Sequence, residues 1–98
     1  MDTIVTGIDF SKSSITAMNL AIDITARANA DLHIIWVETV EIEREKAEDK
    51  LKEYVANAKK KLTNSEVYYH ILPKGKVYTM LNKAVKELDA DLLVIGTH

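Results

Sequence analysis

The feature that most constrains the fold is a regular alternation of short apolar runs with longer amphipathic stretches. Four runs rich in β-branched residues predict strands over residues 3–8, 32–37, 67–72 and 92–95. Between them, apolar residues recur at helical spacing over residues 12–29, 41–62 and 77–88. Such alternation is typical of parallel strands joined by right-handed crossover helices, so we expect a doubly wound α/β fold.

This order of elements also predicts where a ligand would bind. We expect the strand order 3-2-1-4, with the topological switch between the first and fourth strands, where open α/β sheets bind ligands. The first predicted strand leads into Asp9 and Ser11, and the fourth leads into Gly96-Thr97-His98. These two strand ends should lie side by side and form the mouth of a pocket.

Composition narrows the class of protein. A chain of 98 residues is long enough for one domain with one core, which we place over residues 1–98. The net charge of −2 gives no electrostatic reason to expect a nucleic-acid partner or an anionic membrane surface. With no cysteine, disulfides and thiolate metal sites are excluded.

Targeting signals are not apparent in the sequence. The longest apolar runs are only strand-length, too short to span a membrane. Met1 leads directly into a predicted strand, without the basic and apolar regions of a signal peptide. We therefore expect a cytoplasmic protein with no membrane partner.

Several catalytic and phosphate-binding motifs are excluded. The turn Gly7–Ser11 holds a single glycine, whereas a dinucleotide fingerprint needs three, and a Walker lysine motif is lacking as well. The serines at positions 11, 13 and 14 have no histidine placed by the sequence to activate them, and serines at a helix start are usually caps.

Two histidines fall inside adjacent predicted strands. His33 and His70 can meet across the sheet. Two imidazoles with no carboxylate or cysteine nearby are a poor metal site, so we interpret them as partly exposed strand histidines and expect no metal.

Asp9 and Gly96 each leave two interpretations open. A carboxylate at the carboxyl end of a central strand needs a donor. That donor is either a backbone amide of the following turn, or an adenine amino group or ribose hydroxyl. Gly96 either makes a tight turn or lets the backbone approach a phosphate.

Four segments taken together resemble the universal stress protein family. They are Gly7–Ser11, Ala26–Ala30, Asp31–Glu38 and Asp91–His98, and the similarity covers the whole chain in the family's order. The resemblance implies an adenine-nucleotide-binding fold, with ATP and Mg²⁺ as the expected ligands. It also implies a nucleotide-binding set: Thr6, Gly7, Asp9, Ser11, Val37, Gly96, Thr97 and His98.

Within that set the resemblance assigns different roles. Asp9 would contact the adenosine and Val37 would line the adenine site, while Thr6 and Gly7 would shape the wall of the pocket. Gly96 and His98 would border the phosphates.

The resemblance also implies missing parts. The family's phosphate loop reads Gly-x-x-Gly after the fourth strand, and only its first glycine, Gly96, is present. We therefore expect an incomplete domain without the family's fifth strand and last helix, and weak phosphate binding. The apolar run Leu92–Ile95 would then be a sheet edge that invites a homodimer or other strand-edge pairing.

The function predicted from the sequence is a stress-related regulatory domain that binds ATP or a related adenine nucleotide without catalysis. One alternative is a dimerisation and interaction module of the same family that binds no nucleotide. Another is an enzyme that hydrolyses ATP slowly or phosphorylates its own Ser11–Ser14 cluster.

Overall fold

A computed structural model describes residues 2–96 of the chain. It contains strands β1 (Thr3–Gly7), β2 (Asp31–Val37), β3 (Val67–Leu72) and β4 (Leu92–Val94). They alternate with helices α1 (Lys12–Ala28), α2 (Arg44–Lys61) and α3 (Val77–Glu87). The predicted alternation of strands and helices is confirmed.

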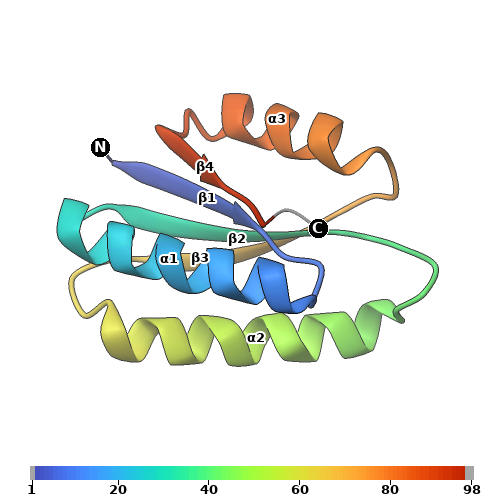
Figure 1. Ribbon diagram of the computed structural model, residues 1–98, viewed down its shortest axis with the longest axis horizontal. Coiled ribbons are helices and arrows are strands. Elements are labelled where there is room, and N and C mark those ends of the chain that lie inside the picture. Colours follow the sequence, from blue (N-terminus) through green and yellow to red (C-terminus); the bar gives the residue numbers. More distant parts are fainter. Residues whose placement is uncertain (1, 97–98) are drawn as a thin grey trace.

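The strands form one parallel sheet in the order β3-β2-β1-β4, as predicted. Figure 1 shows α1 and α2 on one face of this sheet and α3 on the other. From β1 to β3 each new strand is added on the same side of the previous one. α3 then carries the chain back past β2, so that β4 pairs with the opposite side of β1. The carboxyl ends of β1 and β4 therefore form the switch point.

Each face of the sheet has its own hydrophobic core. The larger core lies under α1 and α2, and its fully buried side chains include Ile4, Leu32, Ile34, Trp36 and Leu51. The smaller core lies under α3 and consists of Val5, Ile35, Val37, Leu81 and Ala84. The end of β2 is buried on both faces, which explains its nearly continuous apolar sequence.

Local signals explain the ends of α1. The Ser11 hydroxyl accepts a hydrogen bond from the Ser14 amide at 3.2 Å, so Ser11 is the cap among the three serines that the sequence offered at positions 11, 13 and 14. Asn29 ends the helix in the left-handed conformation, with φ of 52°. Within the helix predicted over residues 12–29, Ala21 is buried and Ala26 is exposed. Ala26 follows the buried Thr25 by one position, and that single step around the helix turns its side chain away from the sheet.

The predicted boundaries differ by three residues at the start of α2 and by one residue at several other ends. α2 begins at Arg44 rather than Glu41, because the backbone is still extended at its cap, Glu43, with φ of −64° and ψ of 136°. β4 ends at Val94 rather than Ile95, since its pairing with β1 stops at Thr6.

The amino ends of β1 and β4 are held together by a carboxylate. One Asp91 oxygen accepts hydrogen bonds from the Asp2 amide at 2.7 Å and the Thr3 amide at 3.0 Å. These backbone bonds lower the pKa of Asp91. The contact aligns the two strands that end at the switch point.

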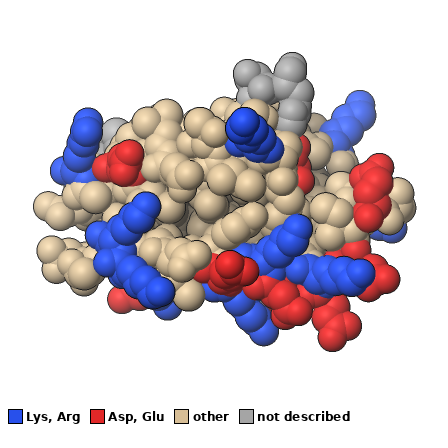
Figure 2. Space-filling view, turned by 60° about the horizontal axis from the view of Figure 1, so that its bottom comes forward, with Lys and Arg blue, Asp and Glu red and all other residues tan. Residues whose placement is uncertain are grey.

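The outer surface of α2 carries charges of both signs. Lys59, Lys60 and Lys61 lie in its last turn, where cations interact favourably with the helix dipole. Figure 2 shows lysines at the end of α2 and acidic side chains mixed with basic ones toward its beginning. The charged run is therefore a solvated helix face.

Candidate functional site

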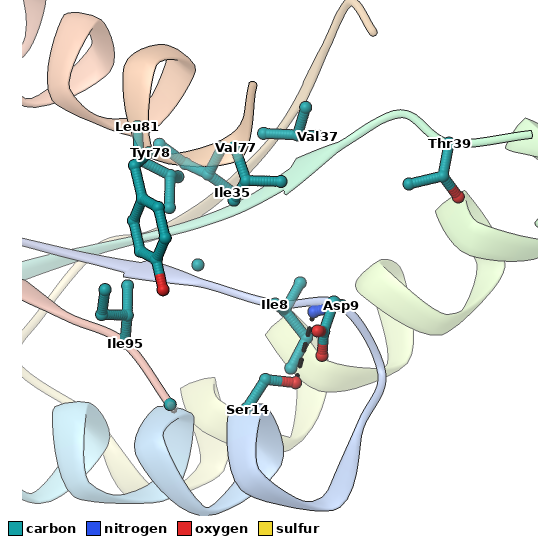
Figure 3. A pocket seen from close by; sticks show the side chains of 12 residues that line it. Ile8, Asp9, Ser14, Ile35, Val37, Thr39, Val77, Tyr78, Leu81 and Ile95 are labelled. Atoms are coloured by element: carbon teal, nitrogen blue, oxygen red, sulfur yellow. Dashed lines mark hydrogen bonds between the residues drawn. The ribbon is translucent and has the colours of Figure 1, made fainter. Parts of the chain in front are cut away.

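A cavity of about 230 Å³ lies at the carboxyl ends of β1 and β2, beside the chain leaving β4 and under the first turn of α3 (Figure 3). Most of its wall is apolar, and its polar side chains come from four elements: Asp9 follows β1, Ser14 is in α1, Thr39 follows β2 and Tyr78 is in α3. The lining residues are Gly7, Ile8, Asp9, Ser14, Ile35, Val37, Thr39, Val77, Tyr78, Leu81, Ile95 and Gly96.

Half of the predicted site residues line this cavity, namely Gly7, Asp9, Val37 and Gly96. Two others lie beside it without lining it. Thr6 is fully buried, and its hydroxyl donates a 2.9 Å hydrogen bond to the Val94 carbonyl. Ser11 is occupied as the cap of α1. Thr97 and His98 lie outside the described residues.

The Asp9 carboxylate is oriented by the turn that follows it. Its Oδ1 accepts a hydrogen bond from the Ser11 amide at 2.9 Å. The Asp9 amide donates to the Ser14 hydroxyl at 3.2 Å, and that hydroxyl donates to the Ser11 carbonyl at 3.0 Å. The structural interpretation of Asp9 is thus confirmed. A carboxylate accepts several hydrogen bonds at once, so the same group can also receive a ligand donor.

Phe10 anchors this turn from the opposite face of the sheet. Its φ of 67° is left-handed, a conformation that costs a non-glycine residue about 1–2 kcal/mol. Its ring centroid lies 6.0 Å from that of Trp36 and 6.1 Å from that of Tyr54. The Lys50 ammonium lies 5.3 Å from the same ring. Packing in the larger core therefore holds the Asp9 turn in a strained shape, which no local sequence signal indicated.

The two predicted glycines are required for different close approaches. A Cβ on Gly7 would lie 2.8 Å from a terminal methyl carbon of Leu81. A Cβ on Gly96 would lie 2.5 Å from the Ser13 carbonyl oxygen, which is backbone. Gly96 thus lets the chain leaving β4 pass directly against the first turn of α1, a contact that neither sequence interpretation included.

Sequence reasoning missed the wall that α3 provides. The sequence predicted a helix over residues 77–88 but placed none of its residues at the site. Figure 3 shows the Tyr78 side chain reaching from α3 to the level of Ile95 at the side of the cavity. Tyr78 is 60% exposed, unusual for an aromatic side chain that lines a cavity. Its place in the first turn after β3 was the signal available in the sequence.

Thr39 lines the far side of the cavity, and Figure 3 shows its methyl group turned toward the other lining residues and its hydroxyl turned away from them. Within residues 2–96, its hydroxyl oxygen is buried and has no hydrogen-bond partner. A buried polar group without a partner costs about 1–3 kcal/mol. Because the hydroxyl points away from the cavity, this cost is not assigned to the ligand site.

Residues 2–96 lack a metal-binding cluster and a membrane-spanning helix. That part of the chain contains no group of three or more histidine, cysteine or acidic side chains able to hold a metal ion. Nor does any helix there combine the length and apolar character needed to cross a bilayer.

Comparison with known proteins shows which family the chain belongs to. A model described as "Universal stress protein family" matches residues 1–98. The chain belongs to the universal stress protein family. The resemblance noted in the sequence is thereby confirmed, and the cavity of this universal stress protein lies at the switch point where its predicted site was expected. No curated protein sequence matches the chain.

Solved structures share its fold. Protein Rv1636 from Mycobacterium tuberculosis H37Rv is 28% identical with a TM-score of 0.69, over 99% of this chain and 71% of that chain. Universal stress protein UspA from Lactobacillus plantarum is 19% identical with a TM-score of 0.80, over 99% and 79%. A universal stress protein in complex with cAMP is 22% identical with a TM-score of 0.69, over 95% and 74%.

Proposed function

We propose that this universal stress protein binds an adenine nucleotide, with ATP as the leading ligand, and serves as a regulatory binding module. The observation that carries the proposal is an apolar cavity at the switch point with an oriented carboxylate, Asp9, among its lining residues. A purine base buries its faces against apolar walls, while its amino group or the ribose hydroxyls need an acceptor. Asp9 is that acceptor in our proposal.

The size of the cavity suits part of a nucleotide. Pockets for small molecules usually measure about 300–1,000 Å³, and this one measures about 230 Å³. We therefore assign the base and part of the ribose to the cavity. The phosphates would extend past Gly96 toward Thr97 and His98, with Mg²⁺ bound mainly through the phosphate oxygens. The related complex with cAMP supports a ligand with an adenine base.

The remaining predicted residues act at different distances from the ligand. Gly7 and Val37 contribute to the apolar wall against the base. Thr6 contributes indirectly, because its hydrogen bond to Val94 holds β1 beside β4. Ser11 contributes by orienting Asp9.

Binding without catalysis is the better-supported reading of the cavity. None of the described residues that line it is a histidine or lysine, so no imidazole or amine there is placed to activate a water or a serine. If the chain were instead an enzyme, incubation with ATP and Mg²⁺ would release phosphate or add a phosphate to Ser11, Ser13 or Ser14.

Calorimetric titration with ATP and Mg²⁺ tests the proposal. The unmodified chain should give saturable heat, and Asp9→Ala should abolish it. Asp49→Ala is the matched control, because Asp49 is an exposed carboxylate on α2 and does not line the cavity. A parallel titration with cAMP, which carries a single phosphate, measures how much the additional phosphates of ATP contribute to the affinity. Equal heats for Asp9→Ala and the unmodified chain would overturn the assignment of the site.

A second role rests on β4. Among the described strands β4 pairs only with β1, and its outer edge carries the partly exposed residues Leu92, Leu93 and Val94. We propose that this edge pairs with a strand of a second copy. Sedimentation velocity over a concentration series should show a monomer–dimer equilibrium. A sedimentation coefficient that stays monomeric at the highest concentration would exclude homodimer formation.

A further inference from the structure

Two histidines lie together outside the proposed nucleotide cavity. His33 is in β2 and His70 is in β3, on the sheet face that also carries Ile35 and Val37. The Nδ1 atom of His33 lies 2.7 Å from the Nε2 atom of His70. The expectation that the two side chains meet across the sheet is confirmed, and at this distance the N–H of one ring donates a hydrogen bond to the bare nitrogen of the other.

The two rings are held in place by their surroundings. Their centroids are 5.0 Å apart and their planes differ by 20°, so the rings meet nitrogen to nitrogen. The Tyr68 ring stacks on His33, with centroids 4.7 Å apart. Both histidines are only partly buried, so solvent reaches the pair. Regular backbone pairing between β2 and β3 fixes the spacing underneath.

The two imidazoles are partly removed from water. Burial lowers the pKa of both imidazoles, and the neighbouring His70 lowers the pKa of His33 further. The Asp31 carboxylate opposes this shift, which shows that its negative charge is felt at His33. Asp31 does not join the pair as a ligand, because residues 2–96 contain no group of three or more histidine, cysteine or acidic side chains able to hold a metal ion. The close placement of the two ring nitrogens is what suits a cation.

We propose that His33 and His70 chelate a divalent cation of the copper, nickel and zinc class. Metal–nitrogen bonds of 2.0–2.1 Å put two neighbouring ligand nitrogens about 2.8–3.4 Å apart for square or tetrahedral geometry. The observed separation of 2.7 Å is close to the lower end of that range. A turn of each ring about its side-chain bonds makes the two lone pairs converge on the ion.

The proton balance of this step is simple. The proton that now lies between the rings moves, through water, to the other nitrogen of the ring that carries it. A neutral pair therefore takes up the cation without net proton release. Water or a chelator fills the other coordination positions, because the described residues supply no third ligand group. Copper(II) should bind most tightly, following the usual order of divalent affinities.

A copper(II)–nitrilotriacetate complex is the probe that tests the chelate, since the chelator leaves two adjacent positions on the ion. The titration uses His98→Ala protein as the background, because His98 is the chain's third histidine. In that background we expect one equivalent of the complex to bind. His33→Gln or His70→Gln should each weaken binding about a hundredfold, because the second imidazole acts at high effective concentration. Tyr68→Phe is the control and should bind like the background protein.

Three results would contradict the chelate. A loss of less than about tenfold in either glutamine variant would show a single surface imidazole rather than a chelate. Absence of one-equivalent binding in the background protein would also overturn the proposal. A nuclear magnetic resonance experiment on the unmodified chain needs no variant to fold. Substoichiometric copper should broaden the imidazole signals of His33 and His70 together, and broadening of His98 alone would overturn the proposal.

Discussion

The two faces of the sheet differ in how completely they are covered. Under α1 and α2, the side chains of Ile34 and Trp36 are almost fully buried in the larger core. Under α3, the core is small, and beside it lie the cavity and the partly exposed pair His33 and His70. The well-covered face stabilises the fold, while the other face leaves room and polar groups for ligands.

The faces are nevertheless linked at one turn. Phe10 is anchored among aromatic side chains of the larger core, while the preceding residue, Asp9, lies at the cavity. The covered face thus holds the carboxylate that the other face uses. Substitutions on the two faces should therefore separate stability from ligand binding.

The largest effect is expected from Trp36→Ala. Trp36 is 1% exposed in the larger core, and removing such a ring costs about 3–5 kcal/mol through lost burial and the cavity left behind. Urea denaturation measures the change in the free energy of unfolding. A loss below about 1 kcal/mol would mean that the α1–α2 face can repack and is not the stabilising face.

The two glycines of the site should differ in their sensitivity to a methyl group. Gly96→Ala meets the Ser13 backbone, so we expect a destabilisation of about 2–3 kcal/mol. In Gly7→Ala the new methyl group meets only the end of the Leu81 side chain, which can turn. We therefore expect a loss of about 1 kcal/mol in the free energy of unfolding. Thermal unfolding compares the two variants. Equal losses would contradict the close backbone approach at Gly96.

Tyr78→Ala should affect the α3 face alone. The side chain is 60% exposed, so the free energy of unfolding should change little. If the aromatic ring packs on the bound base, ATP affinity should fall about fivefold, equivalent to about 1 kcal/mol. Calorimetry measures the affinity, and Tyr78→Phe should behave like the unmodified chain. Unchanged affinity in Tyr78→Ala would remove this residue from the proposed site.

The smallest effect is expected from acidification. The pKa values of His33 and His70 are lowered in the folded state, so the unfolded chain binds protons first as the pH falls below about 7. The stability that the neutral pair contributes is present above the ordinary histidine pKa and is lost as the pH falls through the lowered values.

Urea denaturation between pH 7.5 and pH 5 measures this dependence. The double variant His33→Gln with His70→Gln should show a flatter profile over that range, while Asp31 is left unchanged. A profile as steep as that of the unmodified chain would assign the pH dependence to other groups.

The order of the elements, the strand order of the sheet and the place of Asp9 just after β1 could all be predicted from the sequence. These features follow from local periodicity and from the chirality of crossover connections, which need no knowledge of distant contacts. A serine cap for α1 belongs to the same class, because a cap involves residues three positions apart, but the choice of Ser11 among the serines at positions 11, 13 and 14 came from the structure. The family resemblance likewise rested on short segments in their linear order.

The contacts between side chains far apart in the sequence became known only from the folded chain. The left-handed Phe10 is held by Trp36 and Tyr54, which come from later parts of the chain. The contact of Gly96 with the start of α1, and the 2.7 Å approach of His33 to His70, each depend on strand register. Local patterns specify which residues face inward. The distances between those residues arise only when separate elements pack against one another.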